Sequence, residues 1–173
     1  RPCQRRRAGL RVGERLALGN GAGLVVRGEV TATETSELRL EVEAVERVPR
    51  AFPGIWLAQA LAKGDRDELA IQAATELGVD GVIPWAASRS VSRWEGAKVA
   101  KGRERWSAIV REASKQSVRA WLPELGAPVN TQQLAALAPA PHVVVLDPLS
   151  ADSLSQFART FARTDLSDSQ ASV

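Results

Sequence analysis

The chain has 173 residues, of which 45% are hydrophobic and 25% are charged. This composition is typical of one ordinary globular domain or two small ones, and it excludes a disordered chain. No apolar run approaches the ~20 residues of a membrane span, and no signal-peptide pattern is present. The single cysteine, Cys3, excludes an internal disulfide and a multi-cysteine metal site, and the single histidine, His142, argues against a zinc site or a Ser/His/Asp triad. We therefore expect a soluble cytoplasmic protein without a metal.

Positive charge is concentrated in two stretches, although the net charge is only +3. Residues 1–15 hold six arginines, and residues 89–119 hold nine lysines and arginines, so the rest of the chain is acidic. Two basic stretches on an acidic chain favour a polyanionic partner such as nucleic acid. The alternative is a set of solvated faces in an arginine-rich protein.

Residues 1–50 predict a small β domain. Residues 10–18 (LRVGERLAL) show a strand pattern with a Val-Gly-Glu turn, residues 20–23 (NGAG) predict a turn, and strands follow at 24–33 and 37–48. In the last strand, apolar and charged residues alternate, which predicts one face in water. Short antiparallel strands of this kind need closure into a barrel or a partner surface.

A linker at residues 49–53, which contains two prolines, separates this region from a different pattern. Residues 55–62 and 79–85 are apolar runs, as expected for strands buried on both faces. A helical pattern lies between them, and this order predicts a parallel sheet with a right-handed crossover.

The helix between these strands has clear boundary signals. Asp65 is a candidate N-cap with Glu68 as its capping-box partner, and Gly78 is a typical terminator. Apolar residues recur at a spacing of four and predict the packed face: Leu69, Ala73 and Leu77, with Ala70 and Ala74 beside them.

Residues 88–102 are polar and basic and predict a loop with at most one helical turn. A helical period returns over 103–119, with one shared face: Trp106, Ile109, Val110, Ala113 and Ser117. Along its edge, Glu112, Gln116 and Arg119 are spaced so that they can meet one another. Pro123 ends this element.

The remaining elements are shorter. Thr131 is a candidate cap for a helix over 131–137, and 142–146 predicts a third apolar strand with Asp147 and Pro148 at its carboxyl end. After Leu149 the pattern fades. The sequence has no methionine and begins at Arg1, so we expect its natural N-terminus to lie outside it.

Neither a GxGxxG motif after a strand nor a GxxxxGK[ST] motif occurs, and the glycines at 19–23 are interpreted as a turn. The stretch 63–123, however, resembles the bacterial 16S ribosomal RNA uridine N3-methyltransferase family over roughly 65 contiguous residues. The resemblance rests on order and spacing at these positions: Lys63, Arg66, Glu68, Gln72, Glu76, Leu77, Gly78, Pro84, Arg89, Ser90, Lys101, Trp106, Glu112, Ala113, Gln116, Ser117, Arg119 and Pro123. Residues 142–150 resemble the family's next strand, and residues 1–50 are compatible with its PUA-like barrel.

The resemblance implies an α/β protein with a PUA-like RNA-binding domain (1–50) and a SPOUT-class methyltransferase domain with a trefoil knot (52–173). It implies a homodimer that transfers a methyl group from S-adenosylmethionine to ring N3 of a uridine in the small ribosomal subunit, without DNA or a membrane as partner. The family's Gly-Pro-Glu-Gly-Gly loop and its later Leu-Arg-Thr-Glu-Thr segment do not occur here. We therefore expect both domains to be incomplete in this chain.

The candidate site residues fall into three groups. Basic residues of the second charged stretch and of the first helix start are candidates for RNA contact: Lys63, Arg66, Arg89, Arg93 and Lys101. Leu146, Asp147 and Pro148 are candidates for the adenosyl pocket, with a plain turn as the alternative. Arg119, Glu112 and Gln116 form either a catalytic cluster or a structural one. Trp94, in the basic loop, is the candidate for base stacking.

Two other functions remain open. A non-catalytic RNA-binding fragment would keep the barrel and the basic loop without a donor pocket. A generic α/β enzyme for small molecules would not need two basic stretches, and strong salt dependence of RNA binding would separate it from the other two.

Overall fold

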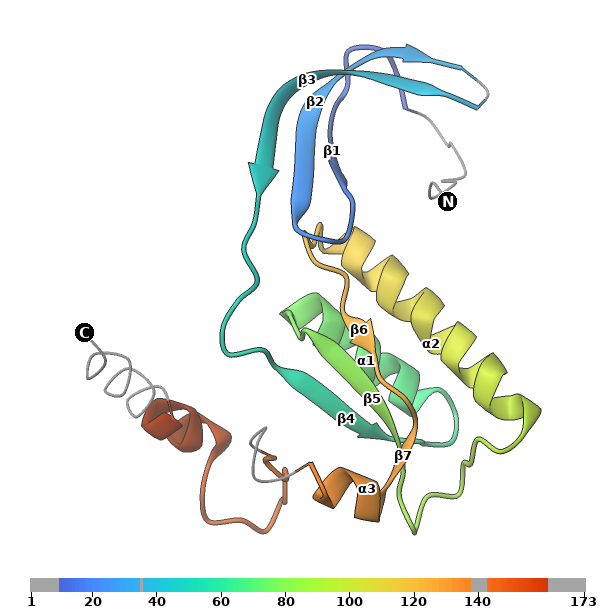
Figure 1. Cartoon of the computed structure of the whole chain (residues 1–173), viewed down its shortest axis with the longest axis vertical. Helices are drawn as coiled ribbons and strands as arrows, with labels where there is room; N and C mark the ends of the chain where they lie inside the picture. Colours follow the sequence, from blue (N-terminus) through green and yellow to red (C-terminus); the bar gives the residue numbers. More distant parts are fainter. Residues whose placement is uncertain (1–9, 35, 138–142, 162–173) are drawn as a thin grey trace. The chain divides into compact units, whose positions relative to one another are not determined.

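The structure is a computed structural model that describes residues 10–34, 36–137 and 143–161. The chain divides into two compact units, Arg1–Leu134 and Ala135–Val173. Figure 1 labels the elements, which are β1 (Arg15–Gly19), β2 (Leu24–Thr33), β3 (Leu38–Arg47), β4 (Trp56–Ala60), α1 (Arg66–Leu77), β5 (Gly81–Ala86), α2 (Ala97–Gln116), β6 (Glu124–Leu125), β7 (Val129–Asn130) and α3 (Thr131–Ala135). Cys3, His142 and most of the first basic stretch lie outside the described residues.

The first three strands form an antiparallel sheet in the order β1-β2-β3, as the sequence predicts. The turn between β1 and β2 is fixed by Asn20, whose Oδ1 accepts the backbone N–H groups of Ala22 at 2.8 Å and Leu24 at 3.0 Å. The predicted turn is confirmed. Among the described residues the sheet stays open, so closure into a barrel remains a prediction.

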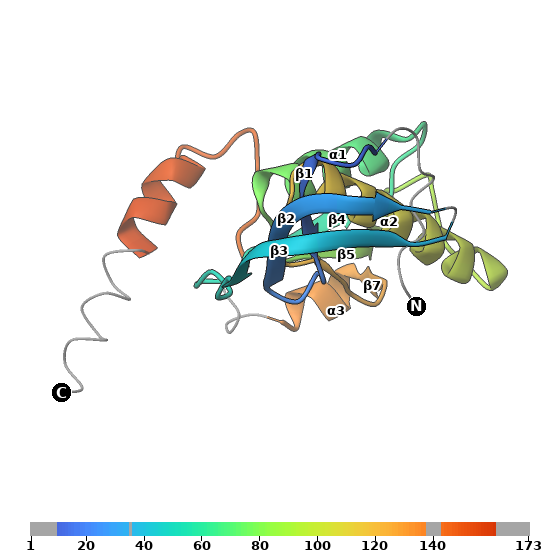
Figure 2. The same ribbon diagram turned by 90° about the horizontal axis from the view of Figure 1, so that it is seen from above.

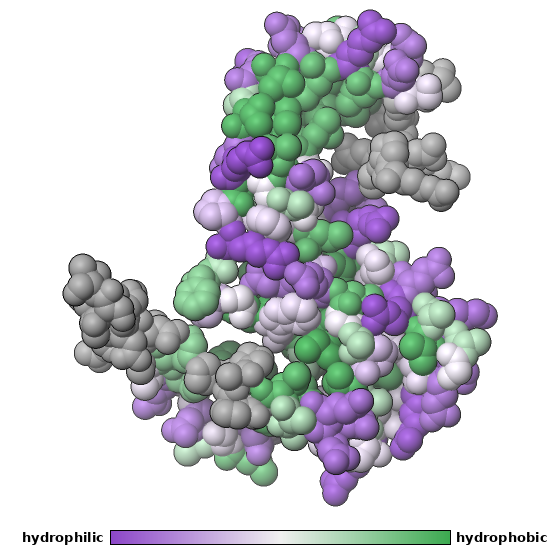
Figure 3. Space-filling model, viewed as in Figure 1, coloured by the Kyte–Doolittle hydropathy of each residue, from purple (hydrophilic) through white to green (hydrophobic). Residues whose placement is uncertain are grey.

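This sheet leaves apolar residues of its edge strand exposed. Val25 and Val30 are buried, whereas Val42 and Val45 of the edge strand β3 are 53% and 63% exposed. Figure 3 shows a broad apolar surface over these strands. The charged residues of β3, Arg39, Glu41 and Glu43, are exposed as predicted for a face in water, and no second layer of described residues covers the opposite, apolar side.

A second sheet is entirely parallel and confirms the predicted strand–helix–strand unit. β4 pairs with β5, and β6 and β7 pair with successive parts of the other edge of β5. The helices α1 and α2 lie side by side on one face of this sheet (Figures 1 and 2). β5 is largely buried, but Trp56 of β4 is 44% exposed. The prediction that β4 is buried on both faces is wrong because β4 is an edge strand.

The hydrophobic core lies between this sheet and its two helices, and it contains Leu61, Ile71, Val82, Trp106 and Val110. Ile71 and Thr75 are the fully buried residues of α1, while Leu69 and Leu77 are 65% and 89% exposed. The predicted packed face of α1 is therefore wrong, because a different side of the helix is buried. The predicted set Leu69, Ala73 and Leu77 recurs every four residues, as the buried Ile71 and Thr75 do, so the spacing could not decide which set faces α2 and β4.

The predicted C-terminal boundary of α1 is confirmed, but the predicted N-terminal cap is wrong. Gly78 has a φ of 112° and donates its N–H to the Ala74 carbonyl at 3.0 Å, as a helix terminator does. Asp65 precedes α1 in the left-handed conformation, with φ 60°, and makes no capping hydrogen bond. Its side chain cannot reach the helix N–H groups from this backbone conformation, so the predicted capping box is absent.

α2 begins and ends earlier than predicted. It runs from Ala97 to Gln116, so its first six residues belong to the stretch predicted as a loop. Trp106, Val110 and Ala113 are buried as expected, and Ser117 is exposed. Val118 has a φ of 51°, which interrupts the helical path before Arg119.

Trp121 fixes the linker after β3. Its Nε1–H donates to the Val48 carbonyl at 2.8 Å, and the Arg50 guanidinium lies 4.6 Å from the centre of its ring. Gly23 makes room for this ring, because a Cβ there would lie 2.5 Å from a ring carbon.

The last described elements are short. α3 is capped by Asn130 rather than Thr131: Asn130 Oδ1 accepts the Gln133 N–H at 2.8 Å, while Thr131 Oγ1 accepts the Trp85 Nε1–H at 3.2 Å. Residues 143–146 form no strand with any described residue and are exposed, which overturns the predicted third strand. Residues 154–161 are helical. None of the described helices is both long and apolar enough to cross a membrane.

Candidate functional site

A basic pocket of about 430 Å³ lies between the loop after β5 and the first turns of α2. We call it the basic pocket, and it is lined by Val91, Ser92, Arg93, Trp94, Lys98, Lys101, Gly102 and Arg105. Three of its four cations come from α2 at positions i, i+3 and i+7, which share one helix face. The fourth cation, Arg93, comes from the loop.

Trp94 holds the loop against the helix. Its ring packs edge-on against the buried Trp106, with centroids 5.2 Å apart and an interplanar angle of 76°. Gly102 permits this approach, because a Cβ there would lie 2.3 Å from the Trp94 ring. The structure gives Trp94 an anchoring role that the sequence did not indicate, and its base-stacking role stays a prediction.

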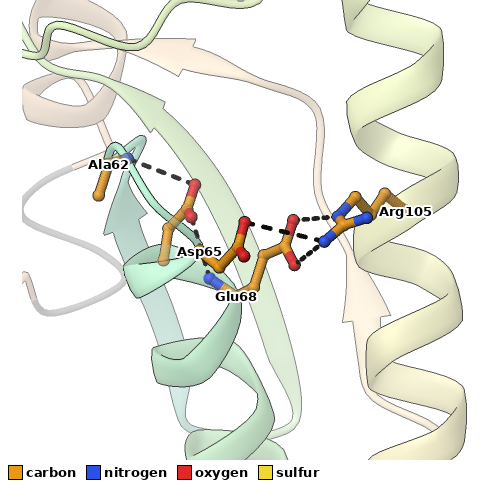
Figure 4. A network of polar contacts seen from close by, with 5 residues as sticks. Ala62, Asp65, Glu68 and Arg105 are labelled. Carbon is orange, nitrogen blue, oxygen red and sulfur yellow. Dashed lines mark hydrogen bonds and ion pairs between the residues drawn. The ribbon is translucent and has the colours of Figure 1, made fainter.

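The cations of the basic pocket differ in their partners. Among the described residues, no carboxylate forms an ion pair with Arg93, Lys98 or Lys101. Arg105, in contrast, binds Glu68 through two parallel hydrogen bonds, one of them 2.6 Å from Nη2 to Oε2 (Figure 4). These hydrogen bonds and the charge of Glu68 raise the pKa of Arg105, and Asp65 lies 3.8 Å away.

A smaller pocket of about 200 Å³ shares Arg105 and Trp94 with the basic pocket, but it is acidic. Its carboxylates are Asp65, Asp67 and Glu68. Asp67 is only 6% exposed and accepts the N–H groups of Ala62 at 3.3 Å and Glu68 at 3.0 Å. In the part of the chain that the structure describes, no group of His, Cys, Asp and Glu could hold a metal ion.

The five residues predicted to contact RNA are all exposed, but they do not all converge. Arg93 and Lys101 meet in the basic pocket. Lys63 and Arg66 lie at the start of α1 beside the acidic pocket without lining it, and Arg89 lies in the loop outside the basic pocket.

The structure separates Glu112, Gln116 and Arg119, so the expectation that they meet is wrong. Glu112 pairs with Lys115 at 2.9 Å. Arg119 turns back to the end of α1 and donates to the carbonyls of Thr75, Val79 and Gly78, at 2.9, 2.6 and 3.1 Å respectively. Burial lowers the pKa of Arg119, and Asp80 opposes this effect.

Leu146, Asp147 and Pro148 form an exposed turn in the second unit. Asp147 Oδ1 accepts the Leu149 N–H at 2.9 Å, and its carbonyl accepts the Ser150 N–H at 3.1 Å. Leu146 is 70% exposed. These residues by themselves do not enclose a bound donor, and their role in a cofactor site remains a prediction.

Two members of the basic pocket, Lys98 and Arg105, were not among the sequence candidates. Their spacing with Lys101 was a usable signal, but the predicted loop over 88–102 concealed the helix face that they share. The pairing of Arg105 with Glu68, 37 residues away in sequence, depends on how α1 and α2 pack and has no local signal.

Fold and site together define an α/β protein with a positively charged pocket, a kind of surface that favours polyanions. The sequence matches the RNA methyltransferase domain family over residues 50–171, and the chain belongs to this family. The family resemblance seen in the sequence is thereby confirmed.

Relatives support the same assignment. The chain is 42% identical over 125 residues to ribosomal RNA small subunit methyltransferase E of Mycobacterium bovis, which covers 72% of this chain and 48% of the relative. It is 42% identical over 80 residues to the Bacillus subtilis protein of the same name, covering 46% of this chain and 31% of the relative. The chain thus spans at most about half the length of these two relatives.

Solved structures share the fold. A methyltransferase from Legionella pneumophila in complex with bound SAM aligns with a TM-score of 0.69 at 29% identity, covering 84% of this chain and 61% of that one. A ribosomal RNA small subunit methyltransferase E from Neisseria gonorrhoeae bound to S-adenosyl methionine aligns with a TM-score of 0.64 at 26% identity, covering 76% and 54%.

Proposed function

We propose that this chain belongs to an S-adenosylmethionine-dependent methyltransferase that modifies 16S ribosomal RNA at ring N3 of a uridine. Within this chain, the observation that supports the proposal is the basic pocket, whose cations can bind RNA. The names of the relatives and the donor bound in the two solved structures support the reaction and the cofactor. The fine specificity for uridine N3 rests on the resemblance of residues 63–123.

In this proposal residues 1–50 belong to a PUA-like RNA-binding domain, and residues 52–173 belong to a SPOUT-class domain with a trefoil knot. Two copies form a homodimer in the cytoplasm and act on the small ribosomal subunit. S-adenosylmethionine supplies the methyl group. The exposed turn at Leu146–Pro148 does not fit the donor by itself, so the steps below concern only the RNA.

Methylation at ring N3 requires that the uracil loses its N3 proton and that the nitrogen faces the methyl group in line. Such a reaction depends mainly on positioning and on stabilising the developing negative charge. A base in structured RNA must also leave its stack to reach the donor. Cations that bind the flanking phosphates hold it there, and we assign this task to Arg93 and Lys101 in the basic pocket, with Lys63, Arg66 and Arg89 around it.

The proposal is tested by methyl transfer from radiolabelled S-adenosylmethionine to small ribosomal subunits that lack the modification. The expected result is labelled 16S RNA with a single reverse-transcription stop, because a methyl group at N3 blocks Watson–Crick pairing. Labelling of DNA or of protein instead of RNA would contradict the proposal. RNA binding without any transfer would support the non-catalytic RNA-binding function instead.

A further inference from the structure

The basic pocket contains a charge arrangement that calls for an anion. Lys98, Lys101 and Arg105 lie on one face of α2 over about 10 Å of helix length, and Arg93 faces them from the loop. Like charges held this close repel one another, and a bound polyanion removes that repulsion. The row of cations is longer than one phosphate group, which favours consecutive phosphates of a chain.

The residues that line the pocket favour a single strand over a duplex. It is an open site between a loop and a helix, and Trp94 lines it beside the cations. Single-stranded nucleic acids bind in grooves that combine cations along the backbone with an aromatic side chain.

Glu68 neutralises one of the four cations. Its carboxylate accepts hydrogen bonds from Nε and Nη2, which form one edge of the Arg105 guanidinium, and its own side chain is only 19% exposed. Arg105 is 61% exposed and lines the basic pocket as well as the acidic one. Water screens an ion pair whose arginine is this exposed, so an incoming phosphate can compete with Glu68 for Arg105.

We propose that the basic pocket binds the backbone of a single-stranded segment of the substrate RNA, and that Glu68 is an internal competitor which Arg105 leaves in order to bind a phosphate. This inference rests on the proposed function, because it takes the substrate to be RNA. Arg105 therefore acts in two states. In the free protein it ties α2 to α1, and in the complex it completes the pocket.

The test measures binding of a fluorescently labelled single-stranded oligouridine to the whole chain by anisotropy. Glu68→Gln frees Arg105 while keeping the shape of the side chain. Because Arg105 contacts the phosphate in both proteins but no longer has to leave an ion pair, the slope of log K against log salt is expected to stay near that of the wild type, while binding tightens by up to about fivefold. The same oligomer annealed to its complement is expected to bind more weakly than the single strand.

Two variants separate this mechanism from a simple change in net charge. Glu76→Gln removes the same charge from the same helix, about 12 Å further along, where the carboxylate accepts a hydrogen bond from Gln72. It is expected to change affinity much less than Glu68→Gln. In the double variant Glu68→Gln/Arg105→Gln, the gain is expected to disappear, since the freed cation is gone.

The outcomes separate this inference from the function on which it rests. Equal affinities for Glu68→Gln and Glu76→Gln, with wild type still binding RNA, would overturn the competitor role and leave the proposed function intact. Tighter duplex binding would overturn the single-strand assignment. Failure of the wild type and all variants to bind RNA would overturn both proposals. If Glu68→Gln does not fold, Arg105→Gln alone must weaken RNA binding for the inference to stand.

Discussion

Two arginines bind the two ends of α1, and they do so in different ways. Arg105 meets a carboxylate side chain, Glu68, in the first turn, and it is 61% exposed. Arg119 is half-buried and donates to three backbone carbonyls at the last turn. A side-chain partner can be exchanged for a ligand, but backbone carbonyls cannot be released without opening the helix end. We infer that Arg119 stabilises the fold, while Arg105 is available for binding.

The largest effect is expected from Arg119→Ala. The substitution leaves carbonyls at the end of α1 without donors and removes a positive charge from the negative end of the helix dipole, which lowers the free energy of unfolding by about 2–3 kcal/mol. Urea unfolding measures this change. Arg111→Ala, at an exposed position of α2, is the control and is expected to change stability by less than about 0.5 kcal/mol. Equal effects of the two substitutions would break the comparison.

A second substitution tests the support of the basic pocket. Gly102→Ala places a Cβ 2.3 Å from the Trp94 ring, so the ring and its loop must move. Overpacking of this kind costs about 1–3 kcal/mol, and the displaced loop weakens RNA binding. Thermal unfolding and tryptophan fluorescence report both changes.

The sign of this effect is diagnostic. In an ordinary helix position, Gly→Ala stabilises by roughly 0.5–1 kcal/mol. Ala100→Gly, at an exposed position two residues earlier, measures that ordinary effect in the opposite direction. A stabilised Gly102→Ala variant with unchanged fluorescence would contradict the contact between Trp94 and α2.

The smallest effect is expected from Glu68→Gln on stability. Because the Arg105 side chain is 61% exposed, water screens its ion pair with Glu68, so the unfolding midpoint is expected to stay close to that of the wild type. Differential scanning calorimetry of Glu68→Gln beside Glu76→Gln checks this expectation. A loss as large as that of Arg119→Ala would mean that both ends of α1 are structural, and the distinction between the two arginines would fail.

Local chemistry made much of the fold predictable. The strand–helix–strand unit followed from two apolar runs around a helical period, and the end of α1 followed from Gly78. Trp106, Val110 and Ala113 were predicted to share a packed face because their spacing in α2 allows only one core-facing side. These features depend on residues that are close in sequence.

The rest depends on tertiary packing or on unusual backbone. In α1, the predicted set Leu69, Ala73 and Leu77 recurs every four residues, and so do the buried Ile71 and Thr75, so only the position of α2 decides which set is covered. The left-handed conformation of Val118 is rare for a β-branched residue. It could not be predicted, and without it Arg119 was placed on the wrong face of a longer helix.

The site, like the fold, was predicted only where its residues are close in sequence. The basic stretch identified Arg93 and Lys101, since clustering of charge is visible in the sequence. Lys98 and Arg105 became part of the pocket only once the helix was seen to begin at Ala97. The pairing between Arg105 and Glu68 joins two helices and has no trace in the local sequence.

The central claim is that the basic pocket holds the RNA backbone, and the salt dependence of RNA binding tests it most directly. In the double variant Lys98→Gln/Lys101→Gln, the slope of log K against log salt is expected to become shallower by about 1.4, because two phosphate contacts are lost. The control Arg111→Gln/Lys115→Gln removes two charges from the other end of α2 and is expected to leave the slope nearly unchanged. If both double variants show the wild-type slope, the basic pocket does not hold RNA.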